Sequence, residues 1–331
     1  MPDLGLQVQG VYPWPFMREV AKFAERQEWT TFWLTDGQWK DPLTEIAALA
    51  RETEHLRLGS GIATIYSRSP FVFAQQAAAL DDISGGRFVL GLGTGHQDRA
   101  EDMHGTSLVR PTARMRDYLT IIRGAFTGAP FTHAGKILQV NNLHQVFPPP
   151  SGTVPIYVAS LGPRMARLAG EMADGVVLHL VTPEAFERIK GNLAEGAAAG
   201  RDPAGIRIVS SILCNASRDR EAARRKIEGE VSQYVRWPFY QAELERSGFQ
   251  EEVGKLRLAW GKGDASAAAE EVTPRMMERL PVAVSPGEVW EKAERYWALG
   301  VDEIILNIRP FPDDPVASFR ETMEEVAALG R

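Results

Sequence analysis

Residues 58–95 read LGSGIATIYSRSPFVFAQQAAALDDISGGRFVLGLGTG, and this stretch decides the fold. One apolar segment ends in the glycine-rich residues 59–62, a helix rich in alanine and glutamine follows Pro70, and a second apolar segment ends at residues 91–95. The pattern predicts a strand–helix–strand unit with glycines at the carboxyl end of each strand. Ligands bind at that end in parallel α/β folds, and glycine lets a flat ring or a phosphate approach the backbone closely.

Short apolar segments alternate with amphipathic ones along the rest of the chain. Prolines stand near several of the predicted helix starts, where the missing N–H costs little. Eight strand–helix pairs predict a parallel sheet closed into a (β/α)8 TIM barrel, with an open doubly wound sheet as the alternative. The predicted strands are 4–9, 31–35, 56–63, 88–93, 155–160, 175–180, 206–214 and 303–308. The predicted helices are 15–27, 42–52, 71–82, 112–126, 163–172, 183–199, 220–235 and 314–329.

Two stretches exceed this repeat. Residues 129–153 suggest a hairpin-like excursion before the fifth strand. Residues 237–286, between the seventh helix and the eighth strand, combine an aromatic cluster of Trp237, Phe239 and Tyr240 with short helices. Insertions of this length are usually lids or contact surfaces. No linker separates them from the rest, so we expect one domain over residues 1–331.

Composition narrows the partners and the compartment. The chain has 331 residues and a net charge of −6, which argues against nucleic acid as a partner. No apolar run is long enough to span a bilayer, and no basic leader precedes an apolar segment at the start. The single cysteine, Cys214, excludes an intramolecular disulfide. We therefore expect a cytoplasmic protein that acts on a small molecule.

If the barrel closes, the carboxyl ends of its strands share one pocket. The residues there offer neither a carboxylate pair for hydrolysis nor a serine–histidine–acid set at a nucleophile elbow. Glycines with scattered hydrogen-bonding groups suit an organic cofactor that supplies the reactive atoms itself. These strand-end residues are Gln9, Asp36, Gly61, Ile62, Ala63, Thr64, Thr94, Gly95, His96, Ser160, Leu161, Gly162, His179, Asn215, Asn307, Ile308 and Arg309.

Four polar residues near the strand ends each have two interpretations. Asp36 meets a ligand or forms a turn. His96 is a proton donor or acceptor near the reacting carbon, or a polar lining residue. His179 contacts substrate or does not. Arg164, at the start of a predicted helix, binds an anion together with the helix N-terminus, or forms a surface ion pair. The six histidines show no metal-ligand spacing, so we expect no metal site.

The run Gly91-Leu92-Gly93-Thr94-Gly95 is a weak match to a dinucleotide-binding fingerprint. That fingerprint requires Gly-x-Gly-x-x-Gly at the first strand–helix turn. Here the run follows the fourth predicted strand. The last glycine of the pattern falls on His96 in one register and on Asp98 in the other. Neither register completes it.

Four segments together are specific for a known group of enzymes: residues 59–70, residues 83–95, residues 155–163 with 173–175, and residues 300–306. Through them the chain resembles the bacterial luciferase-like superfamily of flavin and deazaflavin enzymes. It is most similar to the branch that uses coenzyme F420, which includes methylene-tetrahydromethanopterin reductase. The resemblance covers nearly the whole chain.

The resemblance implies a (β/α)8 barrel, a deazaflavin ring at the strand ends, a non-proline cis peptide at Gly61–Ile62 that bulges against the ring, and a homodimer. Together with the strand-end residues, it leads us to expect roles for individual residues. His96 would be the acid or base and Asp36 would orient the ring. Trp39, His179 and Thr182 would meet the substrate. The implied cofactor contacts are Asp36, Gly61, Ile62, Thr64, Thr94, Gly95, Arg99, Ser160, Leu161, Gly162, Arg164 and Met165.

Departures from relatives refine this picture. The sugar-phosphate dehydrogenase of the branch has a histidine where this chain has Gly37, a glutamate in place of His96 and a lysine in place of Thr182, which argues against that activity. FMN monooxygenases often carry Glu-His-His where this chain has Asp36-Gly37-Gln38. We therefore expect hydride transfer through F420. An FMN-dependent monooxygenase and a non-catalytic ligand-binding barrel are the alternatives.

Overall fold

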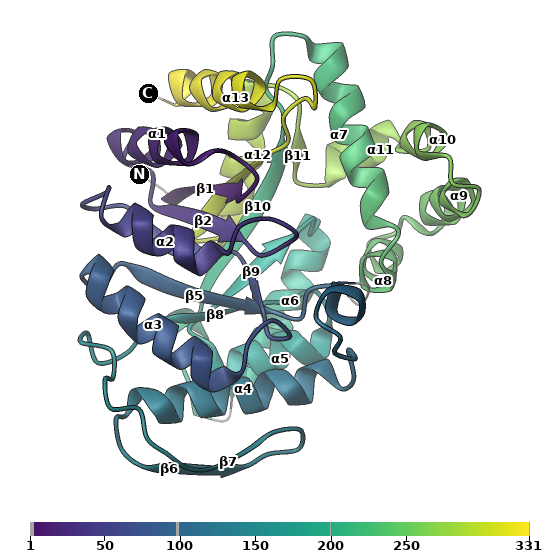
Figure 1. The fold of residues 1–331 in the computed structure, drawn as a ribbon. Coiled ribbons are helices and arrows are strands. Elements are labelled where there is room, and N and C mark those ends of the chain that lie inside the picture. The colour runs from purple at the N-terminus through teal and green to yellow at the C-terminus, as the bar shows by residue number, and fades with distance from the viewer. Residues whose placement is uncertain (1–2, 97–98, 199, 331) are drawn as a thin grey trace.

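The computed structural model describes residues 3–96, 99–198 and 200–330. Within that part of the chain, eight parallel strands close a barrel in the order β1–β2–β3–β5–β8–β9–β10–β12, and β12 pairs with β1 (Figure 1). The predicted TIM barrel is confirmed, and the open doubly wound sheet is excluded. The barrel strands are β1 (Asp3–Gln9), β2 (Thr31–Thr35), β3 (Arg57–Ser60), β5 (Phe88–Gly93), β8 (Ile156–Ala159), β9 (Gly175–His179), β10 (Arg207–Cys214) and β12 (Glu303–Ile308).

Helices cover the outside of the barrel (Figure 1). Many begin with proline after a serine, threonine or aspartate whose side-chain oxygen accepts a backbone N–H, as at Asp41 and Ser69. The helices around the barrel are α1 (Trp14–Arg26), α2 (Pro42–Ala50), α3 (Pro70–Ser84), α4 (Pro111–Phe126), α5 (Pro163–Met172), α6 (Pro183–Ala197), α12 (Pro286–Leu299) and α13 (Pro315–Leu329). Short π and 3-10 turns occupy Arg99–Met103 and Pro203–Gly205.

The third predicted strand, 56–63, is wrong as one continuous element. The structure divides it into β3 and a short β4 (Ala63–Thr64), separated by Gly61 and Ile62. Through Leu58 and Gly59, β3 pairs with the start of β5, whereas β4 pairs with its end. The two intervening residues leave the ladder and border the site described below.

The seventh repeat also differs from the prediction. The helix predicted at 220–235 exists as α7 (Arg220–Tyr234), but it packs with the insertion. The helix that packs on β10 and β12 is α12, which we did not predict. Its N-cap, Ser285 before Pro286, is the same start signal that marks α2 and α3.

Both predicted excursions are present. Residues 129–153 contain an antiparallel hairpin of β6 (Phe131–Ala134) and β7 (Gln139–Leu143), which projects beyond α4 (Figure 1). The second insertion has its own hydrophobic core, with Phe249, Leu256 and Met276 fully buried. Its elements are α8 (Pro238–Arg246), α9 (Gln250–Gly261), α10 (Ala265–Glu270), α11 (Pro274–Arg279) and β11 (Val282–Ala283).

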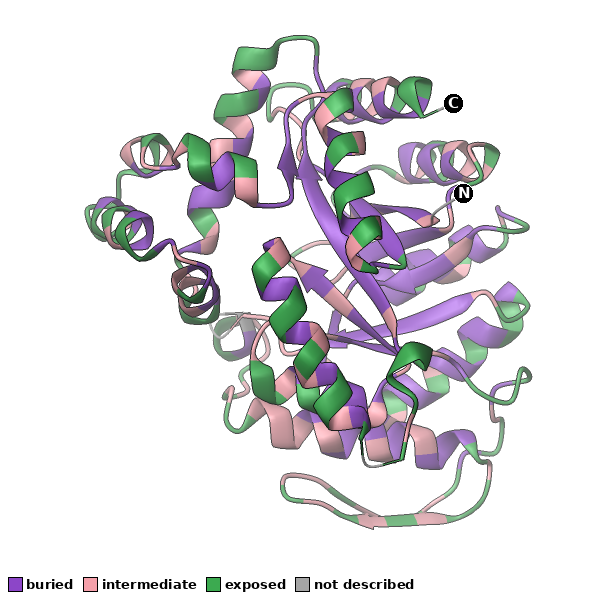
Figure 2. Cartoon of the chain, turned by 180° about the vertical axis from the view of Figure 1, so that it is seen from behind, coloured by how far each residue is buried: buried purple, intermediate pink, exposed green. Residues whose placement is uncertain are grey.

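The barrel strands are almost entirely buried, and the helices bury only the faces turned toward them (Figure 2). Inside the barrel, Trp33, Val89, Tyr157, Val209 and Ile305 form a separate cluster. The fully buried carboxylate of Glu303, on β12, accepts a 2.8 Å hydrogen bond from the indole nitrogen of Trp33. Because Ile305 also lines the cavity above, this packed cluster forms its floor.

Candidate active site

A cavity of about 790 Å³ opens at the carboxyl ends of the barrel strands. Strand ends from around the barrel contribute to its walls, together with α7, α8 and the N-terminus of α5. Sites for organic ligands and cofactors usually enclose about 300–1,000 Å³. The cavity therefore has room for a flat cofactor ring and a small second molecule.

Most of the residues that we predicted to bind ligand meet in this cavity. They come from segments spread over residues 36–179, and the barrel topology brings them together. The residues that line the cavity are Asp36, Trp39, Gly61, Ile62, Thr64, Thr94, Gly95, His96, Ser160, Leu161, Gly162, Arg164, Met165 and His179. Their individual roles stay predictions.

One predicted contact falls elsewhere, and a second cannot be placed because its side chain is not described. Thr182 is buried and is not part of the cavity lining; its hydroxyl accepts a 3.3 Å hydrogen bond from the N–H of Ala185 and donates one to Ser247. It caps α6, so the structure gives it a structural position in place of the predicted substrate contact. The side chain of Arg99 lies outside the described part of the chain.

Backbone forms part of the cavity wall at Gly61 and Ile62, which are joined by a cis peptide bond, as the family resemblance implied. The side-chain amide of Gln7 donates a 2.7 Å hydrogen bond to the carbonyl of Gly61. The N–H of Asp36 donates one of 3.1 Å to the carbonyl of Ile62. Both carbonyls of this segment are thus held, one by a side chain of β1 and one by the residue after β2, and the segment presents a fixed surface to the cavity.

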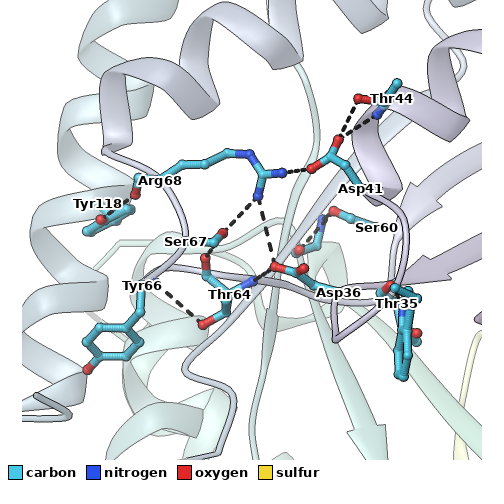
Figure 3. Close-up of polar contacts among 12 residues, drawn as sticks. Thr35, Asp36, Asp41, Thr44, Ser60, Thr64, Tyr66, Ser67, Arg68 and Tyr118 are labelled. Carbon is cyan, nitrogen blue, oxygen red and sulfur yellow. Dashed lines mark hydrogen bonds and ion pairs between the residues drawn. The ribbon is translucent and has the colours of Figure 1, made fainter. Parts of the chain in front are cut away.

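Asp36 anchors the next part of that wall (Figure 3). Its Oδ2 accepts a 3.2 Å hydrogen bond from the N–H of Thr64 and lies 3.9 Å from Nη1 of Arg68. Arg68 also pairs with Asp41 and donates to Ser67. Burial lowers the pKa of Arg68, and the charge of Asp36 opposes that shift. Asp36 therefore lines the cavity and also holds the segment that follows Ile62.

His96 belongs to an aromatic surface that the insertion completes. Its ring stacks on Trp237 with centroids 3.8 Å apart and 13° between the planes, and Phe239 lies 5.5 Å away, nearly parallel. Tyr240 is tilted against the same ring at 6.3 Å. We call these four residues the aromatic wall. All four line the cavity, so the aromatic cluster in the insertion faces the site.

A second group of polar residues comes from three consecutive barrel strands and from α7. His179 ends β9, Ser211 lies on β10, and Arg309 follows β12; Glu230 and Tyr234 reach the same place from α7. We call this group the polar corner. Nδ1 of His179 and Oγ of Ser211 are 2.5 Å apart. The ring of His179 lies 4.8 Å from that of Tyr234.

The two basic side chains of the corner differ in charge. Burial, helped by the charges of Arg309 and His96, lowers the pKa of His179 to about 3, so its imidazole is neutral at physiological pH. Burial also acts to lower the pKa of Arg309, but Tyr234 and Glu230 raise it more. Arg309 is therefore a buried cation beside a neutral histidine.

Sequence reasoning missed several residues of the site. Gln7, Ser211, Glu230, Gln233 and Tyr234 line the cavity but were not among the predicted contacts. Alternation along β1 and β10 places polar side chains in otherwise apolar strands, which was a usable signal for the first two. For the other three, nothing in the sequence indicated that α7 turns toward the cavity.

The described residues contain no group of three or more histidine, cysteine, aspartate or glutamate side chains arranged to hold a metal ion. None of the described helices combines the length and apolar character that crossing a membrane requires.

The fold and the site define a (β/α)8-barrel protein with a glycine-bordered cavity of cofactor size at the strand ends. Comparison with known proteins identifies the group. The profile of the luciferase-like monooxygenase family matches residues 4–303, and the chain belongs to that family.

Individual relatives agree with this assignment. The chain is 30% identical over 300 residues to a 5,10-methylenetetrahydromethanopterin reductase of Archaeoglobus fulgidus, covering 88% of this chain and 89% of the relative. A reductase of the same name from Methanolobus tindarius is 32% identical over 290 residues, covering 86% and 87%. The solved coenzyme F420-dependent tetrahydromethanopterin reductase of Methanopyrus kandleri superposes with a TM-score of 0.85 at 26% identity, covering 100% of this chain and 99% of that one.

Proposed function

We propose that this chain is a coenzyme F420-dependent oxidoreductase that transfers a hydride between C5 of the deazaflavin and a small organic substrate. The observation that carries the proposal is the wall at Gly61–Ile62, where fixed backbone borders a cavity of cofactor size. The relatives named as F420-dependent or methylenetetrahydromethanopterin reductases support the choice of coenzyme.

The residues present fit such a coenzyme. A flat ring needs a surface with few protruding side chains, and Gly61 and Gly95 border the cavity beside Ile62. An anionic side chain needs donors, and no side chain caps the N-terminus of α5 in the described structure. Arg164, at the first turn of that helix, also lines the cavity. A helix N-terminus and a guanidinium together favour an anion.

When bound, the coenzyme supplies the carbon that gives or takes the hydride. The protein's own contribution is placement: Gly61 and Ile62 support one face of the ring, and Asp36 keeps the adjoining segment in position. The aromatic wall and Trp39 exclude water from the path between ring and substrate. His96 donates or accepts the proton at the substrate. Holding the two reactants in one geometry removes several kcal/mol, about 7–11 in favourable cases, from the barrier.

Binding of each cofactor tests the proposal directly. The purified protein is titrated with oxidised F420 and, separately, with FMN, and the fluorescence of each cofactor is followed. We expect saturable binding of F420 and an affinity for FMN that is weaker by about 100-fold, or about 2.7 kcal/mol. The variant Arg320→Gln, which removes a surface ion pair with Glu19, is the control and should bind F420 like the wild type.

The second candidate is an FMN-dependent monooxygenase, favoured by the name of the family that matches residues 4–303. Tighter binding of FMN than of F420 would make the FMN-dependent monooxygenase the better assignment. Binding of neither cofactor would support the third alternative, a non-catalytic barrel. Turnover of reduced F420 with carbonyl, imine or enone substrates would separate an enzyme from a protein that only binds the coenzyme.

We further propose a cytoplasmic homodimer. On α3, Val72 and Ile83 are more than one-third exposed, and Phe147 after the β6–β7 hairpin is 55% exposed. Apolar side chains gathered on one side of a soluble enzyme commonly mark a subunit contact. Light scattering coupled to size-exclusion chromatography should give twice the chain mass of 36.6 kDa. A monomer at micromolar concentration would contradict the dimer and leave the proposed chemistry untouched.

A further inference from the structure

The polar corner contains two buried nitrogen atoms with no hydrogen-bond partner among the described residues. They are Nε2 of His179 and Nε of Arg309, and both side chains line the cavity. Buried polar atoms in folded proteins are nearly always paired, and leaving a charged donor unpaired is especially unfavourable. Two such atoms in one corner indicate that a ligand supplies the missing partner there.

The charges of the corner determine what that partner is. Nε of Arg309 lies 3.6 Å from Oε2 of Glu230, which is too long for a hydrogen bond. The other oxygen of Glu230 is 2.6 Å from Nζ of Lys226. Two cations therefore share one carboxylate, and the neighbouring His179 is neutral. Among the described residues, one positive charge of this group has no counterion of its own, which favours a ligand group with one negative charge over a dianionic phosphate.

The geometry of Arg309 matches a planar acceptor. Its Nη2 donates a 3.0 Å hydrogen bond to the hydroxyl of Tyr234, and its backbone carbonyl accepts one of 2.9 Å from the amide of Asn215. The contact with Tyr234 orients the guanidinium, and its Nε faces Oε2 of Glu230 without a hydrogen bond. A guanidinium edge presents parallel N–H donors that pair with the two oxygens of a carboxylate.

The surroundings of the corner describe the rest of the ligand. The ring of Tyr234 is 4.8 Å from that of Tyr240 and 5.7 Å from that of Trp237, so the corner adjoins the aromatic wall directly. Flat rings pack favourably against such a surface.

We propose that the polar corner binds the single carboxylate of a flat aromatic or conjugated substrate, with Arg309 as the residue that determines this specificity. The substrate body lies along the aromatic wall. This inference rests on the proposed function, because only an enzyme has a substrate. Its test measures ligand binding without turnover, so a negative result would not change the outcome of the cofactor titration.

The experiment compares matched acids and amides by calorimetry, with and without F420. Benzoate and cinnamate are titrated against benzamide, cinnamamide and phenyl phosphate. We expect each acid to bind at least about tenfold more tightly than its amide. Phenyl phosphate should bind no more tightly than benzamide. Arg309→Gln should abolish the preference for the acid while binding the amide as before. Arg309→Lys should keep only part of the preference, because lysine lacks the planar pair of donors.

Two further variants keep the proposal testable if Arg309→Gln does not fold. Tyr234→Phe removes the hydroxyl that orients Arg309 and should weaken acid binding severalfold with amide binding unchanged. The matched control Arg320→Gln loses an arginine of α13 that does not line the cavity and should bind every probe like the wild type.

Several results would overturn the proposal. Equal affinity for acid and amide, binding of neither, or a preference that survives Arg309→Gln would show that no carboxylate is recognised here. Tightest binding of phenyl phosphate would identify a dianion site. The side chain of F420 also carries carboxylates, so F420 affinity is measured in the same variants. A parallel loss of F420 affinity in Arg309→Gln would assign the corner to the cofactor and not to the substrate.

Discussion

Adding one methyl group at Gly93 tests whether the glycines of β5 make room for the cavity wall. A Cβ at this position lies 2.7 Å from both Cγ1 and Cδ1 of Ile62, whereas carbon atoms in contact are normally about 3.5–4.0 Å apart. Ile62 lines the cavity and is not fully buried, so in Gly93→Ala it is displaced into the space proposed for the ring. Overpacking of this kind lowers the free energy of unfolding by about 1–3 kcal/mol.

The assay combines urea denaturation with F420 titration. In Gly93→Ala we expect the free energy of unfolding to fall by about 1–3 kcal/mol. We also expect an F420 affinity about tenfold lower, equal to about 1.4 kcal/mol. The double variant Gly93→Ala/Ile62→Ala removes both crowded atoms of Ile62. Its loss of stability should be smaller than the sum of the single losses by at least about 0.5 kcal/mol, since the two residues are in contact.

Gly191→Ala is the matched control, because a Cβ there meets no atom within 4 Å and the residue is exposed on α6. It should raise stability by up to about 1 kcal/mol through helix propensity and leave F420 binding unchanged. The reasoning is refuted if Gly93→Ala binds F420 as tightly as the wild type. Strict additivity in the double variant would refute it equally.

Three further outcomes are expected. Asp36→Asn weakens the anchor of Thr64 and should lower F420 affinity about tenfold, read by the same titration. Arg87 donates hydrogen bonds to four backbone carbonyls, including those of Leu56 and Ala50, so Arg87→Ala should lose at least about 3 kcal/mol of unfolding free energy in urea, and Arg87→Lys less. The pKa of His179 is about 3 when folded and 6.5 ordinarily, so the unfolded chain takes up its proton first as pH falls. Between pH 7 and 5 the wild type should therefore lose up to about 2 kcal/mol more stability than His179→Gln, and an equal loss in both would contradict the assigned neutrality.

Much of the barrel could be predicted because its signals are local. Proline after a capping residue marks helix starts at Pro42 and Pro70, and glycines end the strands that border the cavity. Once eight repeats are recognised, closure brings the strand ends together, and most of the predicted ligand contacts follow from that single inference. The cis peptide at Gly61–Ile62 came from the family resemblance and not from the residues themselves.

What could not be predicted depends on contacts between distant segments. The capping signal at Ser285 was present, but nothing local says that α12 and not α7 packs on β10 and β12. For the same reason Glu230 and Tyr234 were not assigned to the cavity. Thr182 was assigned to the substrate by analogy, although the same Thr-Pro capping pair also begins α11.

The separate core of the insertion has an evolutionary consequence. Helices α8 to α11 pack on one another and on α7, and the cluster that they form reaches the barrel through apolar side chains such as Leu180 and Leu213. Side chains of this module, with those of α7, line one side of the cavity, whereas the backbone beside Ile62 belongs to the barrel. Selection can therefore exchange or reshape the module to admit new compounds while the cavity wall at Gly61 and Ile62 stays the same.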